Sequence, residues 1–300
     1  MKIKTFIISA ITLFISLYLI IGYHSLKHID KNRIDVSKYI TLVDEVSENK
    51  VQVNWKYVVS IIAVENKNKI KNISDDKIKN TANLFIEKSD NGYKLNSLDN
   101  VLNKLNFTDK EKERVNDYID QLKYFGLTPY RLKEDSKYTK FIEEIKDEAI
   151  KNYKEYKILP SITIAQAILE SSWGESDLAQ IYNNLFGIKA DSSWKGEYVT
   201  LETFEFYDTK IEDKFRVYSN KNQSIKDHAK FLVDNQRYKK YGVFEAKTYI
   251  EQAYALQNAG YSTAEDNSGQ KRYAKDLIEL IRQYNLQLID RLIYNDLIKY

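Results

Sequence analysis

The chain has 300 residues, of which 43% are hydrophobic and 30% charged, enough for one ordinary hydrophobic core and a smaller second one. It contains only 2 proline and 9 glycine residues, which disfavours a turn-rich all-β fold and favours a mainly α-helical (α+β) one. The absence of cysteine excludes disulfides, thiolate catalysis and thiolate metal sites.

The positive charge is concentrated at the amino terminus. Residues 2–33 contribute +4 of the formal net charge of +3, so the rest of the chain carries about −1 and lacks the clustered basic residues that nucleic-acid binding needs. His24, His28 and His228 lie too far apart to suggest a set of metal ligands. His228 falls on the inner stripe of an amphipathic helix, as a satisfied core histidine would. We therefore expect no nucleic acid, no metal and no cofactor.

An uncharged apolar run covers residues 6–22 and is about long enough to cross a bilayer as a helix. Bulky Tyr23 and His24 follow it, without the small-x-small site at which a secretory signal is cleaved. We interpret residues 1–33 as a retained signal anchor that spans the membrane once. Basic residues flank both ends of the run, so its orientation depends on the function inferred below.

Residues 34–135 are predicted to form a small helical helper or spacer domain. Helices are expected over residues 53–64, 76–87, 98–105 and 109–124, with a polar loop at 66–76. Thr108 and Glu111 resemble a capping box for the last helix. Glu65 follows an apolar helix, as Glu170 does further along, and we favour a surface carboxylate over a catalytic one there.

Residues 136–290 are predicted to form a larger helical domain, followed by a tail at 291–300. Residues 137–156 are amphipathic, and apolar residues recur at helical spacing in three later stretches. These are Ile225, Ala229 and Leu232; Ala246, Tyr249, Ile250 and Ala253; and Tyr273, Leu277, Leu280 and Tyr284. Residues 194–218 are rich in β-branched and aromatic residues around a polar DTKIED turn at 208–213, which predicts a β-hairpin.

A helix that begins at Pro160 carries Glu170 near its end. An apolar arc on this helix places Glu170 on the opposite side; the arc consists of Ile164, Ala165, Ile168 and Leu169. We expect Gly174 to end the helix, so that its carbonyl end favours a protonated Glu170. Trp173 could supply an apolar wall that desolvates the acid. These features fit a general acid, but helical periodicity alone also fits a solvated glutamate.

The run ILPSITIAQAILESSWGES (158–176), followed by NNLFGIK (183–189), resembles the glucosaminidase family of bacterial autolysins and flagellar rod-associated hydrolases, glycoside hydrolase family 73. Further landmarks follow in the order of that family: WKGEYVTLETFEF (194–206), FRVY (215–218), SIKDHAKFL (224–232) and LQNAGYST (256–263). The resemblance covers roughly residues 136–288. It implies a lysozyme-like helical domain with a small β-lobe beside a glycan groove.

The resemblance also implies roles for single residues. Glu170 matches the catalytic acid of the family. The second carboxylate of the family lies on the β-lobe in a T-x-E-aromatic setting, which falls on Glu205, with Glu202 and Glu197 as alternatives. Tyr261 matches a tyrosine beside the acid, where its hydroxyl orients substrate or supports the acid; a plain core tyrosine is the alternative.

Residues near these motifs are candidates for substrate binding. Four aromatic side chains could stack on pyranose rings: Trp173, Phe186, Trp194 and Tyr198. Asn183 and Asn184 could bond acetamido groups. Each of the six is also plausible as a packing residue.

The sequence therefore predicts an endo-β-N-acetylglucosaminidase that cleaves bacterial peptidoglycan, with Glu170 as general acid. Glu205 could act as a nucleophile, activate water or stabilise charge, and the acetamido group of the substrate could itself attack. A muramidase or lytic transglycosylase of the same fold is the first alternative, and a glycan-binding scaffold without turnover is the second. The expected partners are peptidoglycan strands and the cell membrane, with the catalytic domain on the extracytoplasmic side; protein partners are not indicated.

Overall fold

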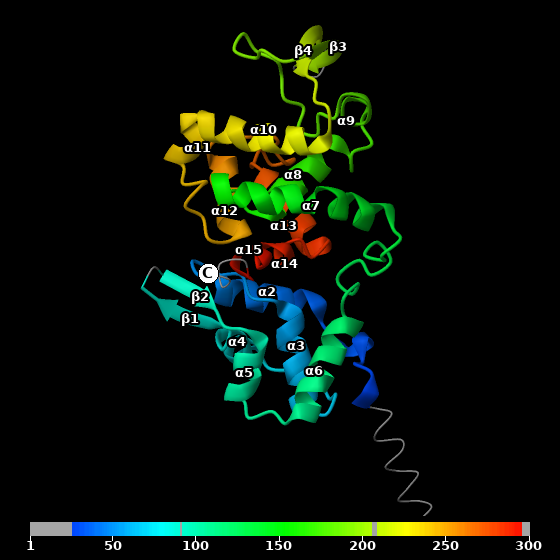
Figure 1. Cartoon of the computed structure of the whole chain (residues 1–300), viewed down its shortest axis with the longest axis vertical. Helices are drawn as coiled ribbons and strands as arrows, with labels where there is room; N and C mark the ends of the chain where they lie inside the picture. Colours follow the sequence, from blue (N-terminus) through cyan, green and yellow to red (C-terminus); the bar gives the residue numbers. More distant parts are fainter. Residues whose placement is uncertain (1–25, 91, 206–208, 296–300) are drawn as a thin grey trace, which may run out of the picture. The chain divides into compact units, whose positions relative to one another are not determined.

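The computed structural model describes residues 26–90, 92–205 and 209–295 and is mainly helical, with two separate two-stranded sheets (Figure 1). The chain divides into two compact units: one drawn from residues 1–46, 53–87 and 95–125, the other from residues 47–52, 88–94 and 126–300. The predicted membrane span at 6–22 lies outside the described residues. Within the described ranges, no helix has the length and apolar character needed to span a membrane.

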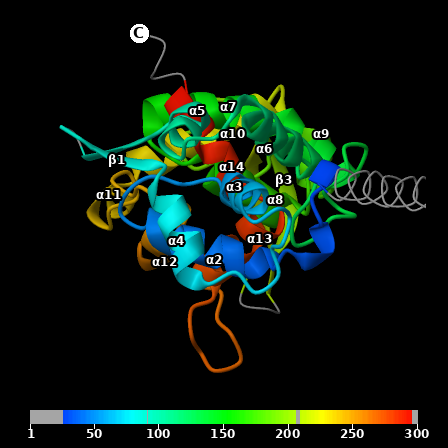
Figure 2. The ribbon, with the colours of Figure 1, turned by 90° about the horizontal axis from the view of Figure 1, so that it is seen from below.

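The larger unit contains the helices predicted downstream of residue 136. They are α7 (Lys137–Tyr156), α8 (Pro160–Ser171), α9 (Asp177–Tyr182), α10 (Lys221–Asp234), α11 (Gln236–Lys240), α12 (Tyr249–Asn258), α13 (Tyr273–Gln283), α14 (Gln287–Asp290) and α15 (Leu292–Asn295). The helix α15 falls within the predicted tail, and its Ile293 is buried in the core. Figure 2 shows the loop between α12 and α13 extending away from the helices.

The helix α8 runs through the core of this unit. Every residue from Pro160 to Ile168 is buried, because α8 packs against α7, α12, α13 and α14. The helix is therefore buried on nearly all sides, including its polar Ser161, Thr163 and Gln166, whereas the sequence predicts one apolar arc. Leu169, which the sequence places on that arc, is 40% exposed, since only the last turn of α8 reaches solvent.

The start of α8 is capped from a distance. Its N-cap residue, Leu159, has no side chain that could accept a hydrogen bond. Asp290 of α14 caps the helix instead. Its carboxylate accepts a hydrogen bond from the Ser161 amide at 2.8 Å and another from the Ser161 hydroxyl at 2.6 Å. The amide would otherwise be an unsatisfied donor of the first helical turn. Burial raises the pKa of Asp290 to about 7.

The end of α8 is a tight left-handed turn. The helix ends at Ser171, three residues before the predicted Gly174, and Ser172, Trp173 and Gly174 have φ of +50°, +68° and +73°. The first two have side chains, so this conformation costs roughly 1–2 kcal/mol for each. At Gly174 a Cβ would lie 2.6 Å from the Phe141 ring, so only glycine fits. The strained turn directly follows Glu170.

The predicted hairpin is present as β3 (Tyr198–Glu205) and β4 (Thr209–Arg216), which pair antiparallel (Figure 1). The register runs from the pair Tyr198 and Arg216 to the pair Glu205 and Thr209. The predicted turn at 208–213 is wrong for residues 209–213, because they belong to β4. Their β-branched Thr209 and Ile211 suit a strand better than a turn.

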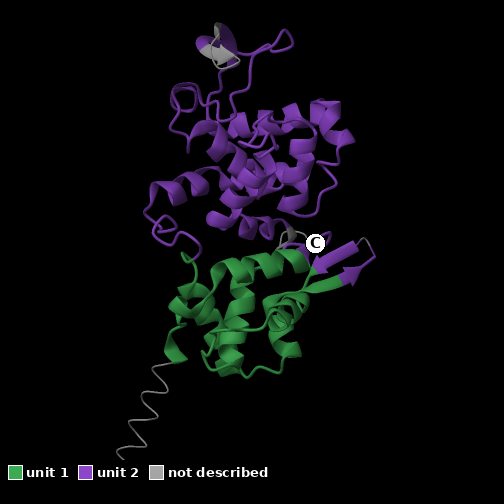
Figure 3. Ribbon diagram, turned by 180° about the vertical axis from the view of Figure 1, so that it is seen from behind, with its two compact units in different colours: residues 1–46, 53–87, 95–125 green, residues 47–52, 88–94, 126–300 purple. Residues whose placement is uncertain are grey.

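The smaller unit (green in Figure 3) contains α2 (Val36–Ser47), α3 (Trp55–Glu65), α4 (Asp75–Asn83), α5 (Leu98–Lys104) and α6 (Asp109–Gln121). The predicted capping box of α6 is confirmed: Glu111 accepts a hydrogen bond from the Thr108 amide at 2.8 Å. The helix predicted over 76–87 ends at Asn83, and the strands β1 (Ile86–Ser89) and β2 (Gly92–Leu95) follow it. Glu65 forms a 2.8 Å ion pair with Lys77, which supports its interpretation as a surface carboxylate.

We predict that Asp290→Ala lowers the free energy of unfolding by about 1–2 kcal/mol, because the Ser161 amide loses its buried acceptor. Asp290→Asn keeps a carbonyl oxygen in place and should cost less. Ser161→Ala removes only the hydroxyl contact and is the matched control. Urea unfolding of the four proteins measures the order, and wild-type stability of Asp290→Ala would contradict the remote cap.

Candidate active site

Glu170 opens into a pocket of about 410 Å³ in the larger unit. Its walls come from the end of α8, the segment 186–191, the helices α10 and α11, and the segment after α12. The lining residues are Glu170, Phe186, Gly187, Ile188, Lys189, Asp191, His228, Phe231, Arg237, Tyr238, Tyr261 and Ser262. The pocket therefore brings Glu170 and two other predicted site residues, Phe186 and Tyr261, to one place.

The environment of Glu170 favours its protonated form. The residue keeps solvent contact at the pocket, but protein atoms crowd its carboxyl group, and this desolvation raises its pKa to about 7. About half of the molecules then carry a proton on Glu170 at neutral pH, as a general acid requires. The sequence attributes this effect to the helix end and to Trp173, whereas burial among the pocket walls is the cause in the structure.

Two stacked tyrosines lie beside Glu170. The rings of Tyr261 and Tyr273 are 5.2 Å apart at an angle of 21°. Gln166, one turn before Glu170 on α8, donates to the Tyr273 hydroxyl at 2.9 Å. Burial is the main cause that raises the pKa of both phenols, and the charge of Glu170 adds to it, so both remain protonated at neutral pH.

A buried histidine forms the next layer. His228 of α10 is 1% exposed and stacks on Phe186, with ring centroids 3.9 Å apart at an angle of 10°. Its Nε2 lies 3.1 Å from the Tyr261 hydroxyl. The sequence predicts a satisfied core histidine; the burial is confirmed, but Nδ1 has no hydrogen-bond partner among the described residues. This feature is unusual enough to need a reason.

The two predicted asparagines hold the chain around the pocket. Asn184 is buried, donates to the carbonyls of Ile188 and Arg216 at 3.0 and 2.9 Å, and accepts from the Ile188 amide. Asn183 ends α9 in a left-handed conformation and donates to the Tyr218 carbonyl at 3.0 Å. Neither lines the Glu170 pocket. Their amides fix the loop that carries Phe186 and do not point to a role in binding acetamido groups.

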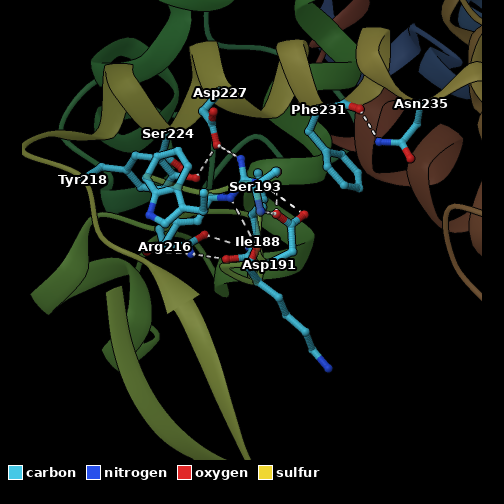
Figure 4. Close-up of polar contacts among 12 residues, drawn as sticks. Ile188, Asp191, Ser193, Arg216, Tyr218, Ser224, Asp227, Phe231 and Asn235 are labelled. Atoms are coloured by element: carbon cyan, nitrogen blue, oxygen red, sulfur yellow. Dashed lines mark hydrogen bonds and ion pairs between the residues drawn. The ribbon is translucent and has the colours of Figure 1, made fainter. Parts of the chain in front are cut away.

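A charged cluster lies at the base of the hairpin (Figure 4). Arg216 of β4 is 8% exposed and donates to the Asp227 carboxylate of α10 at 2.8 Å, which also accepts from the Tyr218 hydroxyl at 2.7 Å. A second carboxylate, Asp191, is 3.8 Å from the guanidinium, and the Trp194 ring lies 4.5 Å below it. The cluster ties β4 to α10 next to the pocket.

This cluster also lines a second pocket of about 290 Å³, which shares Asp191 and Phe231 with the Glu170 pocket. A third pocket of about 250 Å³ shares Trp194, Asp227 and Lys230 with the second. Trp194, a predicted stacking residue, lines both of these neighbouring pockets.

The remaining predicted aromatics lie elsewhere. Trp173 packs edge-on against Tyr284 at 4.6 Å and Tyr138 at 4.8 Å, and it is absent from the lining of the Glu170 pocket. The strained turn directs its indole into this aromatic cluster instead of the groove. Tyr198 begins β3, is 53% exposed and carries Lys214 4.6 Å above its ring. Neither lies in the Glu170 pocket.

The second carboxylate stays a prediction. Glu205 is the last residue of β3 and pairs with Thr209, but its side chain lies outside the described part of the structure. Of the alternatives, Glu202 also lies on β3, where it pairs with Glu212 of β4, and Glu197 precedes β3. Both Glu202 and Glu197 are exposed. In the part of the chain that the structure describes, no group of three or more acidic or histidine side chains could hold a metal ion.

Sequence reasoning did not single out Tyr273, Gln166, Arg216 and Asp227 as site residues. Gln166 had a usable signal, because residues at i and i+4 share a helix face and it lies four residues before Glu170. Arg216 and Asp227 stand within the quoted landmarks FRVY and SIKDHAKFL. Tyr273 had no signal, since its nearness to Glu170 depends on the packing of α13 on α8.

Comparison with known proteins gives consistent matches to the larger unit. Residues 146–286 match the glucosaminidase family, described as mannosyl-glycoprotein endo-beta-N-acetylglucosaminidase. The exo-glucosaminidase LytG of Bacillus subtilis is 44% identical over 156 residues, which cover 50% of this chain and 52% of LytG. The peptidoglycan hydrolase FlgJ of Vibrio parahaemolyticus is 43% identical over 104 residues, which cover 33% of this chain and 34% of FlgJ.

Among solved structures, the catalytic domain of the autolysin Auto from Listeria monocytogenes is 38% identical with a TM-score of 0.43. The match covers 50% of this chain and 86% of that domain. This chain spans about half or less of the length of the two curated relatives above.

The raised pKa of Glu170 predicts a pH-dependent stability difference between the wild type and Glu170→Gln. The folded protein holds the proton up to about pH 7, whereas an unfolded glutamate releases it near pH 4.3. The stabilisation is therefore fully present below about pH 4 and lost as the pH rises to about 7. Chemical unfolding at pH 4, 5.5, 7 and 8.5 measures the difference. The free energy of unfolding of Glu170→Gln should rise relative to that of the wild type between pH 4 and about pH 7 and then stay constant relative to it. Glu197→Gln controls for the loss of one exposed charge, and a pH-independent difference for Glu170→Gln would contradict the raised pKa.

Proposed function

This chain belongs to the glucosaminidase family, and on that premise we propose that it is a peptidoglycan hydrolase, an endo-β-N-acetylglucosaminidase of the bacterial cell wall. The observation that carries the proposal is the desolvated carboxyl of Glu170, whose pKa of about 7 lets it hold a proton in a pocket that the phenol of Tyr261 also lines. Glycoside hydrolysis begins with protonation of the leaving oxygen by such a group.

The mechanism assigns this protonation to Glu170. As the glycosidic bond breaks and the protonated sugar leaves, positive charge develops on the anomeric carbon and ring oxygen of the sugar that stays behind. We propose that Glu205 on β3 meets this charge or activates the attacking water, with the acetamido group of the substrate as the other possible nucleophile. Tyr261, which lines the same pocket, stays protonated and can donate a hydrogen bond to the Glu170 carboxylate after the proton has left.

We propose action within a glycan strand. The Glu170 pocket shares lining residues with a pocket at the Arg216 cluster, which in turn shares lining residues with a pocket at Trp194 and Tyr218. On this proposal a strand longer than one disaccharide contacts these neighbouring pockets during cleavage. Among the lining side chains, Phe186 and Trp194 offer aromatic surface for sugar rings.

The fold of the larger unit and the location of the chain belong to the same proposal. We propose a lysozyme-like arrangement for the larger unit and membrane anchoring through residues 1–33, with the catalytic domain on the cell-wall side. Cell fractionation with an antibody to the chain tests the anchor. Recovery in the membrane fraction, together with protease accessibility from outside, is the expected result; a freely released protein would refute the anchoring.

We predict that the full-length chain solubilises purified peptidoglycan and that Glu170→Gln reduces the rate by at least about 100-fold, because the amide cannot supply a proton. New reducing ends should carry N-acetylglucosamine, on fragments of several disaccharides. Muramic acid ends would assign a muramidase, and anhydro-muramic acid ends a transglycosylase. Strand binding without turnover by the wild type would leave only a scaffold, and equal rates for the two proteins would remove Glu170 as the acid.

The pH dependence of the rate is a separate prediction. Because Glu170 must be protonated and its pKa is about 7, kcat/KM should fall as the pH rises through about 7. Initial rates between pH 4 and 9 on a soluble glycan substrate measure this limb. A rate that stays constant from pH 6 to 9 would show that Glu170 does not act as an acid.

A further inference from the structure

His228 lines the Glu170 pocket but has no direct part in the proposed chemistry. Its ring is buried between Phe186, on which it stacks, and Tyr261, whose hydroxyl lies 3.1 Å from Nε2. The opposite ring nitrogen, Nδ1, is buried and has no partner among the described residues. If the side chain at position 228 only filled space in the core, an apolar residue would be more stable there, because an unmade buried hydrogen bond costs about 1–3 kcal/mol.

The burial decides the charge of this ring. Desolvation lowers the pKa of His228 to about 3, so the ring is neutral at neutral pH and carries a single N–H. If Nδ1 carried that hydrogen, a buried donor would stay unsatisfied. If Nε2 carries it, the donor is used on Tyr261, and only an acceptor lone pair remains unpaired. Orphaned donors are rarer in proteins than under-used acceptors, so Nε2 is the protonated nitrogen.

This tautomer sets the direction of the hydrogen bond at Tyr261. Because the Tyr261 oxygen accepts from His228, the Tyr261 hydroxyl hydrogen is not used on the histidine ring and can be donated into the pocket that Tyr261 and Glu170 both line. On the neighbouring phenol, Gln166 donates to the Tyr273 oxygen at 2.9 Å.

We propose that His228 is a positioning residue for this reaction: as the Nε2–H tautomer it donates to Tyr261 and leaves the Tyr261 hydroxyl hydrogen free to be donated towards Glu170. The inference rests on the proposed function, because it assigns His228 a part in supporting the acid. Without the donor, Tyr261 can turn its hydroxyl hydrogen away from Glu170, so the stabilisation of ionised Glu170 in the transition state is lost.

Two substitutions separate positioning from packing. Glutamine can place its side-chain NH₂ near the position of Nε2, whereas leucine fills the space without a donor. In the full-length chain, His228→Leu should lower kcat by about 10- to 100-fold with KM within about twofold, and His228→Gln should keep kcat within about threefold of the wild type. Leu232→Val, one turn along α10 and buried in the core, is the matched control for destabilisation and should leave kcat unchanged.

Nitrogen-15 NMR of ring-labelled histidine tests the tautomer independently of catalysis. The chain has only three histidines, and the signals of His228 are those that disappear in His228→Gln. We expect a protonated Nε2 and an unprotonated Nδ1 in the wild type. A protonated Nδ1, or a charged ring at pH 6, would overturn the inference even if the leucine variant failed to fold.

Glu170→Gln in the same assays separates a failure of the role assigned to His228 from a failure of the proposed function. If Glu170→Gln is inactive and folded His228→Leu retains the wild-type kcat, the role of His228 is refuted and the proposed function stands. If the wild type cleaves no glycan, the proposed function fails and with it the catalytic role of His228, while the NMR result still decides its tautomer. Equal losses of kcat in the leucine and glutamine variants would also refute positioning through the donor.

Discussion

Glu170 has a raised pKa because protein atoms surround its carboxyl group where the last turn of its helix reaches the pocket. The helix α8 is buried from Pro160 to Ile168, so its last turn emerges among the side chains of α10, the segment 186–191 and the segment after α12. A carboxyl group in that position loses much of its hydration, and the charged form becomes costly. Every other part of the site is arranged around this one desolvated group.

Three separate contacts keep the acid in that position. Asp290 holds the first turn of α8, and the left-handed turn after Ser171 redirects the chain once Glu170 has been placed. The aromatic cluster around Trp173 stabilises this strained turn. Residues held in such conformations persist only where the surrounding packing determines them, and they often lie at functional sites. The strain here is next to the residue to which we assign the chemistry.

The other side of the groove depends on a nearly buried ion pair. Arg216 and Asp227 connect the hairpin to α10, and the energetic cost of desolvating their charges is offset by the additional bonds from Tyr218 and to the Lys189 carbonyl. An ion pair of this kind fixes the geometry of a wall more than it adds stability. It thereby fixes the base of β3 and β4, the hairpin on which Glu205 stands.

The sequence by itself determined the helical class, the hairpin, the helix that carries Glu170 and the candidacy of Glu170, because these follow from local periodicity, capping and a contiguous motif. Its family landmarks also pointed to Tyr261. The sequence placed Leu169 on an apolar arc, although the residue is exposed, and placed Trp173 in the groove, although its ring packs against Tyr138 and Tyr284. Periodicity does not reveal that α8 is enclosed on nearly all sides or that the turn after Ser171 is left-handed. The sequence also assigned His228 to the core without its hydrogen bond to Tyr261. The tertiary structure alone decided the desolvation of Glu170, the remote cap by Asp290 and the meeting of Gln166, Tyr273, Tyr261 and His228. These depend on contacts between residues up to 129 positions apart, which no local pattern encodes.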